Sequence, residues 1–425
     1  MTNTPDSVAV TPSSALVAWP RVAAISSMVA FSLPTFITGI EIAEGTTVDT
    51  GLKALLISSL LLTIIGGLMG VVGAKTRMSS YVLVKIAFGT KGAAIVNVAF
   101  AISLVGWFGV NIDIFANAVQ VLIQKQIGLL IDTVYIEISA GLCMVVTTIF
   151  GFRAINILAS VFTPIIALTT FALLLSASDT FSLSDYLNQE RIGTLSLSQS
   201  VGAIVGAIIV GAIILPDITR FCRHWSGGFY TAICAFMIVQ LFVLFVAAFA
   251  AASFQSNDIL ELLLKAGLGL MAFFIVIAGS WILNSLNLYS TMLSLEATYP
   301  AINNKWGTLC IGLLGVLAAF FNILDAFILF LIVLVTLFIP VCGIILADYF
   351  IVRPASYDSK ELANSANNKS VSVPALVAWL FASSYASLIE LSTNIDSISP
   401  IASIDTILLA AICYVVCFKI SKRGE

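Results

Sequence analysis

Long apolar stretches separated by short polar segments cover most of this 425-residue chain. A helix of about 20 predominantly apolar residues crosses a bilayer, and the pattern contains twelve stretches of that kind. We therefore predict an all-α integral membrane protein with twelve transmembrane spans. The predicted spans are 21–43, 52–74, 91–122, 130–150, 153–176, 200–222, 228–253, 264–296, 305–322, 324–352, 372–390 and 403–420.

Two of these spans contain residues that interrupt a helix. The first holds Pro34 and Gly39 near its centre, and the sixth holds a glycine-rich stretch over 201–211 that is followed by Pro216. Proline removes a backbone donor, and broken helices at corresponding places in two halves are typical of inverted-repeat transporters, whose site lies between them. A repeat of five plus five spans, followed by two more, accounts for the total of twelve.

The chain is expected to divide along the same lines. Its first twenty residues are polar and rich in Pro, Ser and Thr, without the basic start and cleavage site of a secretory signal, so we expect a disordered tail. The predicted parts are a cytoplasmic tail at 1–20, a transporter core at 21–353 with inverted repeats at about 21–176 and 200–353, a cytoplasmic loop at 354–371, and the last two spans with a C-terminal tail at 372–425.

The amino-acid composition indicates that most of the chain lies in a lipid bilayer. Hydrophobic residues make up 60% and charged residues 10%, with a mean hydropathy of +1.09, whereas soluble domains carry about 25% charged residues. With both termini cytoplasmic, the inside segments hold 15 of the 19 Lys and Arg residues and the outside segments hold 4, as the positive-inside rule requires. We predict a multi-pass protein of the plasma membrane (the bacterial inner membrane) with cytoplasmic termini.

The sequence contains no motif of a soluble enzyme or a metalloprotein. Its seven cysteines form no CxxC pair, its single histidine, His224, lies in a loop beside Arg223, and no phosphate-binding glycine loop or nucleophile elbow is present. The longest loops, at about 177–199 and 354–371, are too short to fold as domains. We expect neither an enzyme nor a resident cofactor, and we expect lipid and a small molecule as partners, not nucleic acid.

The third span places polar side chains at membrane depth. Trp107 and Asn111 are four residues apart, so they share one face of the helix beside Gly106 and Gly109. An aromatic plane next to an amide would form half of a pocket for a flat polar ring. Asp113 has no base nearby in the sequence, so it is a candidate proton-sensitive group; a neutral, hydrogen-bonded acid is the equal alternative.

The eighth span carries the densest polar cluster. Ser280, Asn284, Asn287 and Thr291 recur at intervals of four, three and four, so they line one helix face, and Ser285 lies one step around from it. One alternative is that these residues have no binding role and only join membrane helices, with about 0.6 kcal/mol from each hydrogen bond. Their density in this span favours a binding face.

Two further acids lie near the predicted cytoplasmic ends of spans. Asp217 is close to Arg220, and Asp348 is close to Arg353. A charged side chain at membrane depth is costly and needs a partner or a role. Structural ion pairs with these arginines explain both acids.

Six short motifs follow one another between about residue 20 and residue 353: Gly73-Ala-Lys-Thr76, Phe88-Gly-Thr-Lys-Gly92, Gly106-Trp-Phe-Gly109, Asp217-Ile-Thr-Arg-Phe221, Trp281-Ile-Leu-Asn-Ser-Leu-Asn-Leu-Tyr289 and Ala347-Asp-Tyr349. In order and spacing they resemble the nucleobase:cation symporter-1 family, and its bacterial cytosine permeases in particular. The resemblance implies a five-plus-five inverted repeat of the LeuT type with broken helices 1 and 6. It also implies import of a purine, a pyrimidine or a related small ring by alternating access, coupled to Na⁺ or H⁺.

The same resemblance assigns residues to the site. Trp107 would stack on the ring, while amides from the third and eighth spans would bind its polar edge. A coupling cation would lie between the break in the first span and oxygens of the eighth. With Asn287 from the polar face of the eighth span and Ser32 from the first-span break, the residues predicted for the substrate are Trp107, Asn111, Asn284, Asn287, Ile208 and Ser32, and those predicted for the cation are Phe31, Pro34, Asn284 and Ser285.

The chain departs from the cytosine permeases inside this site. Ile208 stands where they carry an aromatic lid, Val210 stands where they carry a serine, and Ser285 replaces an acid. Aromatic pairing adds about 0.5–1.5 kcal/mol beyond burial, so an aliphatic lid predicts a less ring-selective pocket. Because hard cations prefer oxygen ligands, the lost acid leaves Na⁺ and H⁺ both open. An amino-acid or amine carrier of the same fold, with Asp113 facing an amine, is the alternative; the oligomeric state stays open.

Overall fold

A computed structural model describes residues 10–149, 152–269, 271, 275–299, 301–321, 327–357, 371–391 and 397–424, and within those ranges the secondary structure is helical, apart from one isolated bridge between Val17 and Cys222. The first half contains η1 Ser13–Ala15, α1 Trp19–Ala30, α2 Leu33–Gly45, α3 Val48–Thr76, α4 Ser80–Ile127, α5 Thr133–Ile149, α6 Phe152–Thr180 and α7 Leu183–Leu187. The second half contains α8 Leu197–Ile213, α9 Pro216–Thr219, α10 Ser226–Ala232, η2 Ile233–Gln240, α11 Leu241–Phe254, α12 Ile259–Lys265, η3 Ile275–Gly279, α14 Ser280–Thr298, α15 Asn304–Ala319, α16 Phe327–Ala347, η5 Asp348–Val352, η6 Pro354–Tyr357, α18 Val373–Leu391 and α19 Ala402–Gly424.

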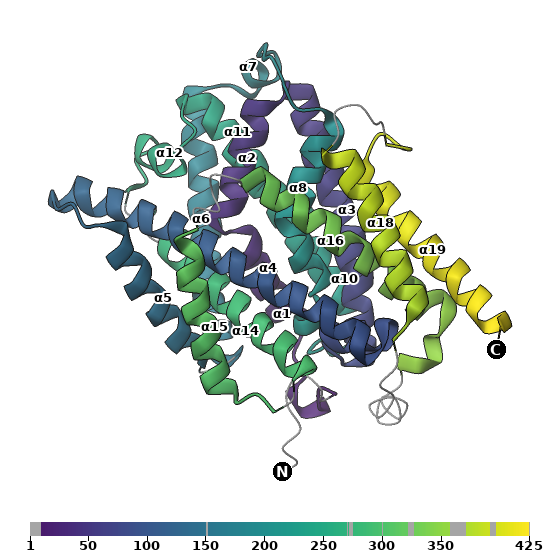
Figure 1. The fold of residues 1–425 in the computed structure, drawn as a ribbon. Coiled ribbons are helices and arrows are strands. Elements are labelled where there is room, and N and C mark those ends of the chain that lie inside the picture. Colours follow the sequence, from purple (N-terminus) through teal and green to yellow (C-terminus); the bar gives the residue numbers. More distant parts are fainter. Residues whose placement is uncertain are drawn as a thin grey trace.

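These helices form the twelve spans of a membrane protein (Figure 1). Spans 1 to 6 are α1 with α2, α3, the part of α4 after Gly89, α5, α6, and α8 with α9. Spans 7 to 12 are α10 with η2 and α11, η3 with α14, α15, α16 with η5, α18, and α19. By length and apolar composition, eight described helices qualify as spans, and the bent pair α1–α2 is a ninth, while α5 and α15 are apolar but shorter.

The first span is broken where the sequence predicts it. Helix α1 ends at Ala30, α2 begins at Leu33, and their axes differ by 52°. Ser32 has an extended backbone, with φ −86° and ψ 156°, and its hydroxyl donates to the Val29 carbonyl at 2.6 Å. Pro34 lies in the first turn of α2, where a missing backbone donor has no cost. The break therefore frees backbone polar groups at the centre of the fold.

The sixth span breaks later than its glycine-rich stretch. Helix α8 continues to Ile213, and the interruption falls just before Pro216, which starts α9. The glycines serve packing instead, since a Cβ at Gly206 would lie 2.5 Å from the Leu331 carbonyl oxygen of span 10. Small residues permit such close helix approach in membranes.

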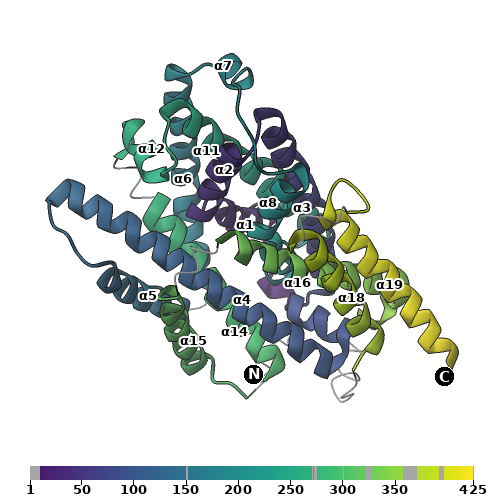
Figure 2. The ribbon, with the colours of Figure 1, turned by 45° about the horizontal axis from the view of Figure 1, so that its top comes forward.

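The packing of the spans repeats after five. Span 2 packs on span 6 as span 7 packs on span 1, span 1 packs on span 5 as span 6 packs on span 10, and span 3 packs on span 9 as span 8 packs on span 4. Exchanging each of spans 1 to 5 with the span five places later (1 with 6, 2 with 7, and so on to 5 with 10) converts one contact into the other, which is the signature of two equivalent repeats. Spans 11 and 12 pack on each other and on span 10, side by side at one edge of the molecule (Figure 2).

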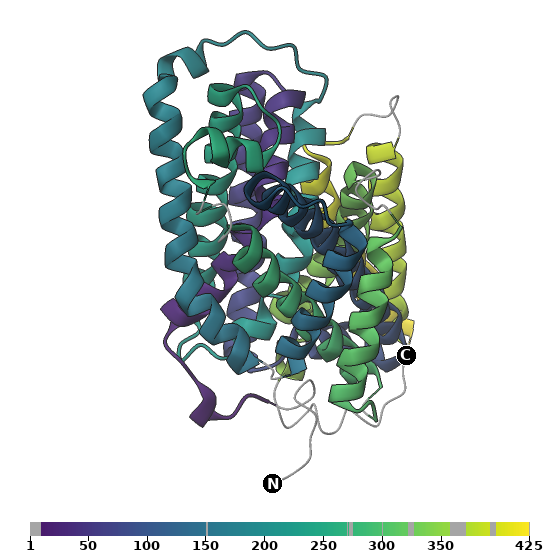
Figure 3. The ribbon, with the colours of Figure 1, turned by 90° about the vertical axis from the view of Figure 1, so that its left-hand side faces the viewer.

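Two four-span groups result from this packing. The first bundle contains spans 1, 2, 6 and 7, and the second bundle contains spans 3, 4, 8 and 9. Helix α4 runs diagonally through the second bundle with α14 and α15 against it (Figures 1 and 2). The start of α1 and the end of α19 lie toward the same end of the molecule (Figure 3), as an even number of crossings requires.

The structure corrects several predicted boundaries. A separate helix, Ser80–Phe88, precedes span 3 and ends at Gly89, whose φ of 74° turns the chain into the span. The span predicted from 264 begins later, because 259–265 form the separate helix α12 and the described part of span 8 starts at Ile275. Much of the predicted loop, 358–370, lies outside the described residues, as do residues 1–9 of the tail.

The tail expected to be disordered is ordered from residue 10 to the start of α1. The Thr11 amide donates to the Arg77 carbonyl at 3.0 Å, and Val17 exchanges backbone hydrogen bonds of 2.8 and 3.1 Å with Phe221 and Arg223. The side chain of Arg77 also donates to carbonyls of 220–223, at 3.2 Å to Arg220 and 3.0 Å to Arg223. The segment before α1 is therefore part of the packed end of the first bundle.

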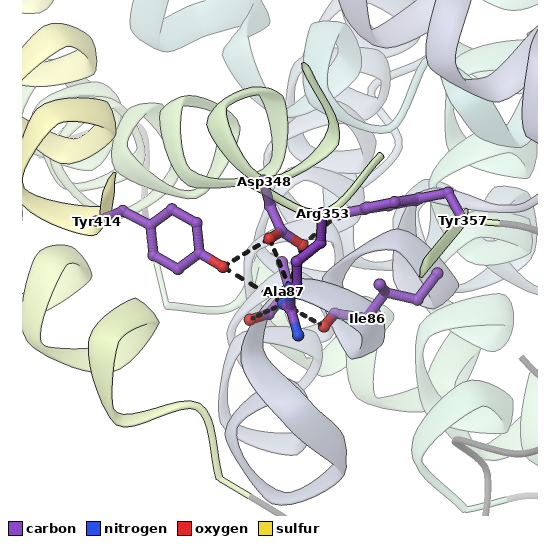
Figure 4. Close-up of polar contacts among 6 residues, drawn as sticks. All are labelled: Ile86, Ala87, Asp348, Arg353, Tyr357 and Tyr414. Atoms are coloured by element: carbon purple, nitrogen blue, oxygen red, sulfur yellow. Dashed lines mark hydrogen bonds and ion pairs between the residues drawn. The ribbon is translucent and has the colours of Figure 1, made fainter. Parts of the chain in front are cut away.

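A partly buried ion pair fixes the inner end of span 10 (Figure 4). Arg353 contacts both carboxylate oxygens of Asp348, at 2.9 and 3.0 Å, and its guanidinium also donates to the Ile86 carbonyl at 3.0 Å. The hydroxyls of Tyr357 and Tyr414 donate to the same carboxylate at 2.8 and 2.7 Å. Burial lowers the pKa of Arg353, but hydrogen bonds and charge from Asp348 outweigh burial and raise that pKa. Of the two ion pairs predicted from the sequence, the one between Asp348 and Arg353 is present, while the Arg220 Nε donates to the backbone carbonyl of Asp217 at 3.2 Å.

Candidate functional site

A cavity lies between the two bundles, at the level of both helix breaks. The centre of a water molecule can sample about 70 Å³ of it, and about 10–15 Å³ on this measure holds one water, so the cavity has room for a small ring. Its walls come from spans 1, 3, 6, 7 and 8. The lining residues are Ser26, Val29, Ser32, Pro34, Thr35, Leu104, Trp107, Ala207, Ile208, Val210, Gly211, Ile214, Leu215, Ile218, Phe236, Leu283, Leu286, Asn287 and Ser290.

Trp107 supplies the aromatic wall. It is 6% exposed and lies on α4, and two rings of span 10 contact it edge-on: Phe330 at 5.2 Å and Phe327 at 6.1 Å between centroids. A Cβ at Gly106 would lie 3.2 Å from the Phe330 ring, so a larger residue there would crowd this approach. The two phenylalanine rings therefore hold the indole of Trp107 in place. Sequence reasoning found Trp107 but not its partners in span 10, because one apolar span does not reveal which residue faces another.

Asn287 supplies an amide from span 8. It lines the cavity, is 7% exposed, and its Nδ2 has no hydrogen-bond partner. Buried amides are normally satisfied, so this donor is available to a bound molecule. Ile208, on span 6, lines the same cavity as the aliphatic wall that the sequence predicts.

The other two predicted amides are not among the lining residues. Asn111 is fully buried and its Nδ2 donates to the Trp107 carbonyl at 2.7 Å, one helical turn back. Asn284 is also fully buried, and its Nδ2 donates to the Phe108 carbonyl at 3.3 Å. The Asn111 bond stays within span 3, whereas the Asn284 bond joins span 8 to span 3 of the second bundle. Asp113 is likewise not a lining residue, and its Oδ1 accepts a hydrogen bond of 2.7 Å from Asn117.

The cation ligands implied by the sequence fall into two groups. The position that a Cβ would take on Gly279 lies 3.1 Å from the Phe31 carbonyl oxygen, so the first-span break touches the start of α14. Close by on α14, the hydroxyls of Ser280 and Ser285 and the Oδ1 of Asn284 are buried without hydrogen-bond partners. Oxygen atoms of this kind suit a hard cation. Pro34, by contrast, lines the substrate cavity.

Sequence reasoning missed several lining residues. Ser26 lies on α1, before the break, and its hydroxyl is buried without a partner. Phe236 lies in η2, a π-helical segment of span 7, and π-helical turns recur at functional sites. Neither residue stands out in the sequence, because a lone serine or phenylalanine in an apolar span is ordinary.

Comparison with known proteins identifies the family. The family model described as permease for cytosine/purines, uracil, thiamine, allantoin matches residues 29–415. The chain belongs to this permease family. Cytosine permease from Escherichia coli (strain K12) is 29% identical over 316 residues, covering 73% of the permease described here and 74% of that relative.

Solved structures agree on the fold. A nucleobase-cation-symport-1 family transporter, in a closed conformation with bromovinylhydantoin bound, matches with a TM-score of 0.84 at 18% identity, over 99% of this permease and 96% of that chain. The same transporter in an inward-facing conformation gives 0.82. A Na⁺-coupled sialic acid symporter gives 0.68 at 11% identity, over 100% and 93% of the two chains. The predicted family and the predicted twelve-span, inverted-repeat fold are confirmed. The permease is a multi-pass membrane transporter of the nucleobase type.

Proposed function

We propose that the permease imports a nucleobase or a closely related small heterocycle by alternating access, together with Na⁺ or H⁺. The observation that supports this most directly is that the ring of Trp107 and the unpartnered amide of Asn287 open into one cavity between the broken spans. A planar molecule with polar edges satisfies both: it can stack on the indole and accept a hydrogen bond from the amide.

The lining also limits the chemistry of the substrate. Among the described residues that line the cavity, none is charged. A free carboxylate or ammonium ion would be costly in such a site, because a buried charge needs a partner. This favours a neutral ring over the amino-acid and amine substrates of the alternative, for which Asp113 would have to face the cavity. The aliphatic wall at Ile208 supports a range of ring sizes rather than one tightly stacked ring.

The coupling cation is proposed to bind beside the substrate, between the first-span break and α14. The Phe31 carbonyl and the free oxygens of Asn284 and Ser285 provide the ligands. A cation there would hold the first bundle against the second, and the substrate would do the same from the adjacent cavity. Each ligand would thereby favour the same conformation, which is what coupling requires. The charge bias along the sequence supports cytoplasmic termini.

Uptake by reconstituted protein tests this function. Purified permease is first screened by thermal shift against cytosine, uracil, purines, hydantoin and allantoin, with and without Na⁺. Uptake of the stabilising compound is then compared in wild type, in Trp107→Ala and in Trp306→Ala, a matched change at a tryptophan that is 68% exposed. We expect Trp107→Ala to lose uptake at normal protein levels and the control to keep it. Unchanged uptake by Trp107→Ala removes this residue from the site.

A further inference from the structure

The floor of the cavity lies directly above a buried polar layer that joins the two bundles. Leu215 and Ile218 of span 6 and Ser290 of span 8 line the cavity. The residues next to them in the chain meet across it: the Arg220 guanidinium donates to the Tyr289 hydroxyl, with 3.3 Å between Nη2 and the oxygen. This contact connects the first bundle to the second.

The arginine in this layer is deeply buried. Arg220 is 2% exposed, and its Nε donates to the backbone carbonyl of Asp217 at 3.2 Å. Its own carbonyl accepts from Arg77 at 3.2 Å. A buried guanidinium is retained only where hydrogen bonds satisfy it, so losing the contact with Tyr289 costs free energy. The bond to Tyr289 thus has a closed and an open arrangement with different energies.

Asp217 makes a second contact in the same layer. Its carboxylate accepts from both the backbone amide and the hydroxyl of Ser80, at 2.8 and 2.7 Å, and both residues are fully or almost fully buried. Ser80 starts the helix that leads through Gly89 into span 3 of the second bundle. An acidic side chain at a helix N-terminus is well placed to stabilise it. The short helix α9 therefore contacts the entry to the second bundle as well as its span 8.

The position of this layer defines its role. It lies at the end of the first bundle where residues 11–17 pack, which the charge bias assigns to the cytoplasm. Alternating access requires one bundle to rock against the other. Contacts that join the bundles on one side of the cavity must break for that side to open.

We propose that the Arg220–Tyr289 and Asp217–Ser80 contacts form the cytoplasmic gate of the permease and hold the inward path shut until substrate and cation are bound. The inference rests on the proposed transport function for its purpose, but the gate can be observed without any substrate. Both acid and arginine belong to the Asp217-Ile-Thr-Arg-Phe221 motif, of which Ile218 lines the cavity.

The molecule offers a closely matched control at the same end. The Arg353 guanidinium contacts the Tyr414 hydroxyl at 3.3 Å, the same distance as in the gate, and Tyr414 also donates to Asp348 (Figure 4). These residues join span 10 to span 12 and do not bridge the two bundles. Tyr414→Phe therefore removes the same chemical group from the same kind of contact without touching the gate.

The experiment measures access to the cavity from each side of the membrane. Ala207, a small lining residue on span 6, is replaced by cysteine in the full-length protein, and a membrane-impermeant thiol reagent is added to one side of oriented vesicles. Labelling of the protein without Ala207→Cys gives the background from native cysteines. The rate is then compared for Tyr289→Phe, Asp217→Asn and Tyr414→Phe.

We expect Tyr289→Phe and Asp217→Asn each to raise the cytoplasmic labelling rate by at least about tenfold, since a hydrogen bond to a charged group is worth that factor in an equilibrium constant. Tyr414→Phe should leave the rate unchanged, and labelling from the outside should fall or stay constant in the gate variants. Wild-type rates in both gate variants, or an equal rise in Tyr414→Phe, overturn the proposal.

Two further measurements keep the outcome interpretable. If Asp217→Asn does not yield folded protein, Ser80→Ala takes its place. That variant removes only the hydroxyl donor to the same carboxylate, and it must raise the cytoplasmic labelling rate by the same factor. Binding of the base identified by thermal shift is measured in Tyr289→Phe and should persist. Faster labelling without binding or uptake of any base would support the gate and contradict the proposed substrate, so the two failures are distinguishable.

Discussion

Replacing Asn287 should separate substrate binding from stability. In the free protein its Nδ2 is buried, without a partner, and a buried donor in this state costs about 1–3 kcal/mol. Asn287→Ala removes that donor. The substrate-free variant should therefore melt at or above the wild-type temperature, although most changes in a membrane core lower it.

The substrate should respond in the opposite direction. Without the amide, a ring carbonyl or nitrogen enters the cavity with no donor opposite it, at a cost of about 1–3 kcal/mol. Since about 1.4 kcal/mol corresponds to a factor of ten, Kd should rise by about 5- to 160-fold. Vmax at saturating substrate should change much less than KM, because the bundles and the gate are untouched.

The assay is a thermal-shift and binding titration with the preferred base. Asn304→Ala is the matched control, since Asn304 lies in the exposed first turn of α15 and outside the cavity. It should match wild type in Kd. A lower melting temperature for substrate-free Asn287→Ala together with an unchanged Kd would show that the amide supports packing, and would refute the assignment.

Two further predictions concern the packing that holds the site. A Cβ at Gly228 would lie 2.1 Å from the Gly70 carbonyl oxygen, so Gly228→Ala must push spans 2 and 7 apart and should cost about 1–3 kcal/mol. A Cβ at Gly211 would have Val29 as its nearest neighbour, at 3.8 Å, so Gly211→Ala should leave the melting temperature unchanged. Equal melting temperatures for Gly228→Ala and Gly211→Ala would contradict the role of close packing. Asp348→Asn breaks a partly buried ion pair and should cost about 1.5–3 kcal/mol, the value of a hydrogen bond to a charged group, seen as a clear fall in melting temperature. Asp49→Asn breaks the exposed ion pair with Lys53 and should cost at most about 1 kcal/mol. Similar losses of stability in Asp348→Asn and Asp49→Asn would refute the role of burial.

The sequence was sufficient for the architecture because lipid restricts the choices. An apolar stretch of membrane length has to be a helix, so the number of spans follows from counting, and Pro34 marks the break in span 1 within a few residues. The break in span 6 was harder to place. Its glycines form a continuous helix against span 10, and only Pro216 marks the interruption. Glycine spacing alone does not distinguish close packing from a break.

The site was only partly predictable, for a geometrical reason. Trp107, Ile208, Asn287 and Ser32, which are predicted from the sequence for the substrate, line the cavity. Asn284, on the same predicted face as Asn287, is instead buried against the backbone of span 3. Three residues along a helix correspond to about 300° of rotation, so neighbours on a broad face can look into different spaces. Helical spacing defines a face, but the partner helices decide which part of that face meets the cavity.

Span 8 connects the two proposed ligands. Four successive polar residues of α14, namely Ser280, Asn284, Ser285 and Asn287, each have a buried polar atom without a partner, and membrane proteins seldom leave such atoms unsatisfied. The oxygens of the first three suit a cation, and the amide of the fourth faces the ring cavity. Binding of either ligand satisfies atoms on one rigid helix and holds that helix against the broken first span. Each ligand then stabilises the conformation in which the other site is formed, so reciprocal affinity between cation and base follows from linkage. If the base binds equally well with and without Na⁺ and at all pH values, this shared helix does not couple them.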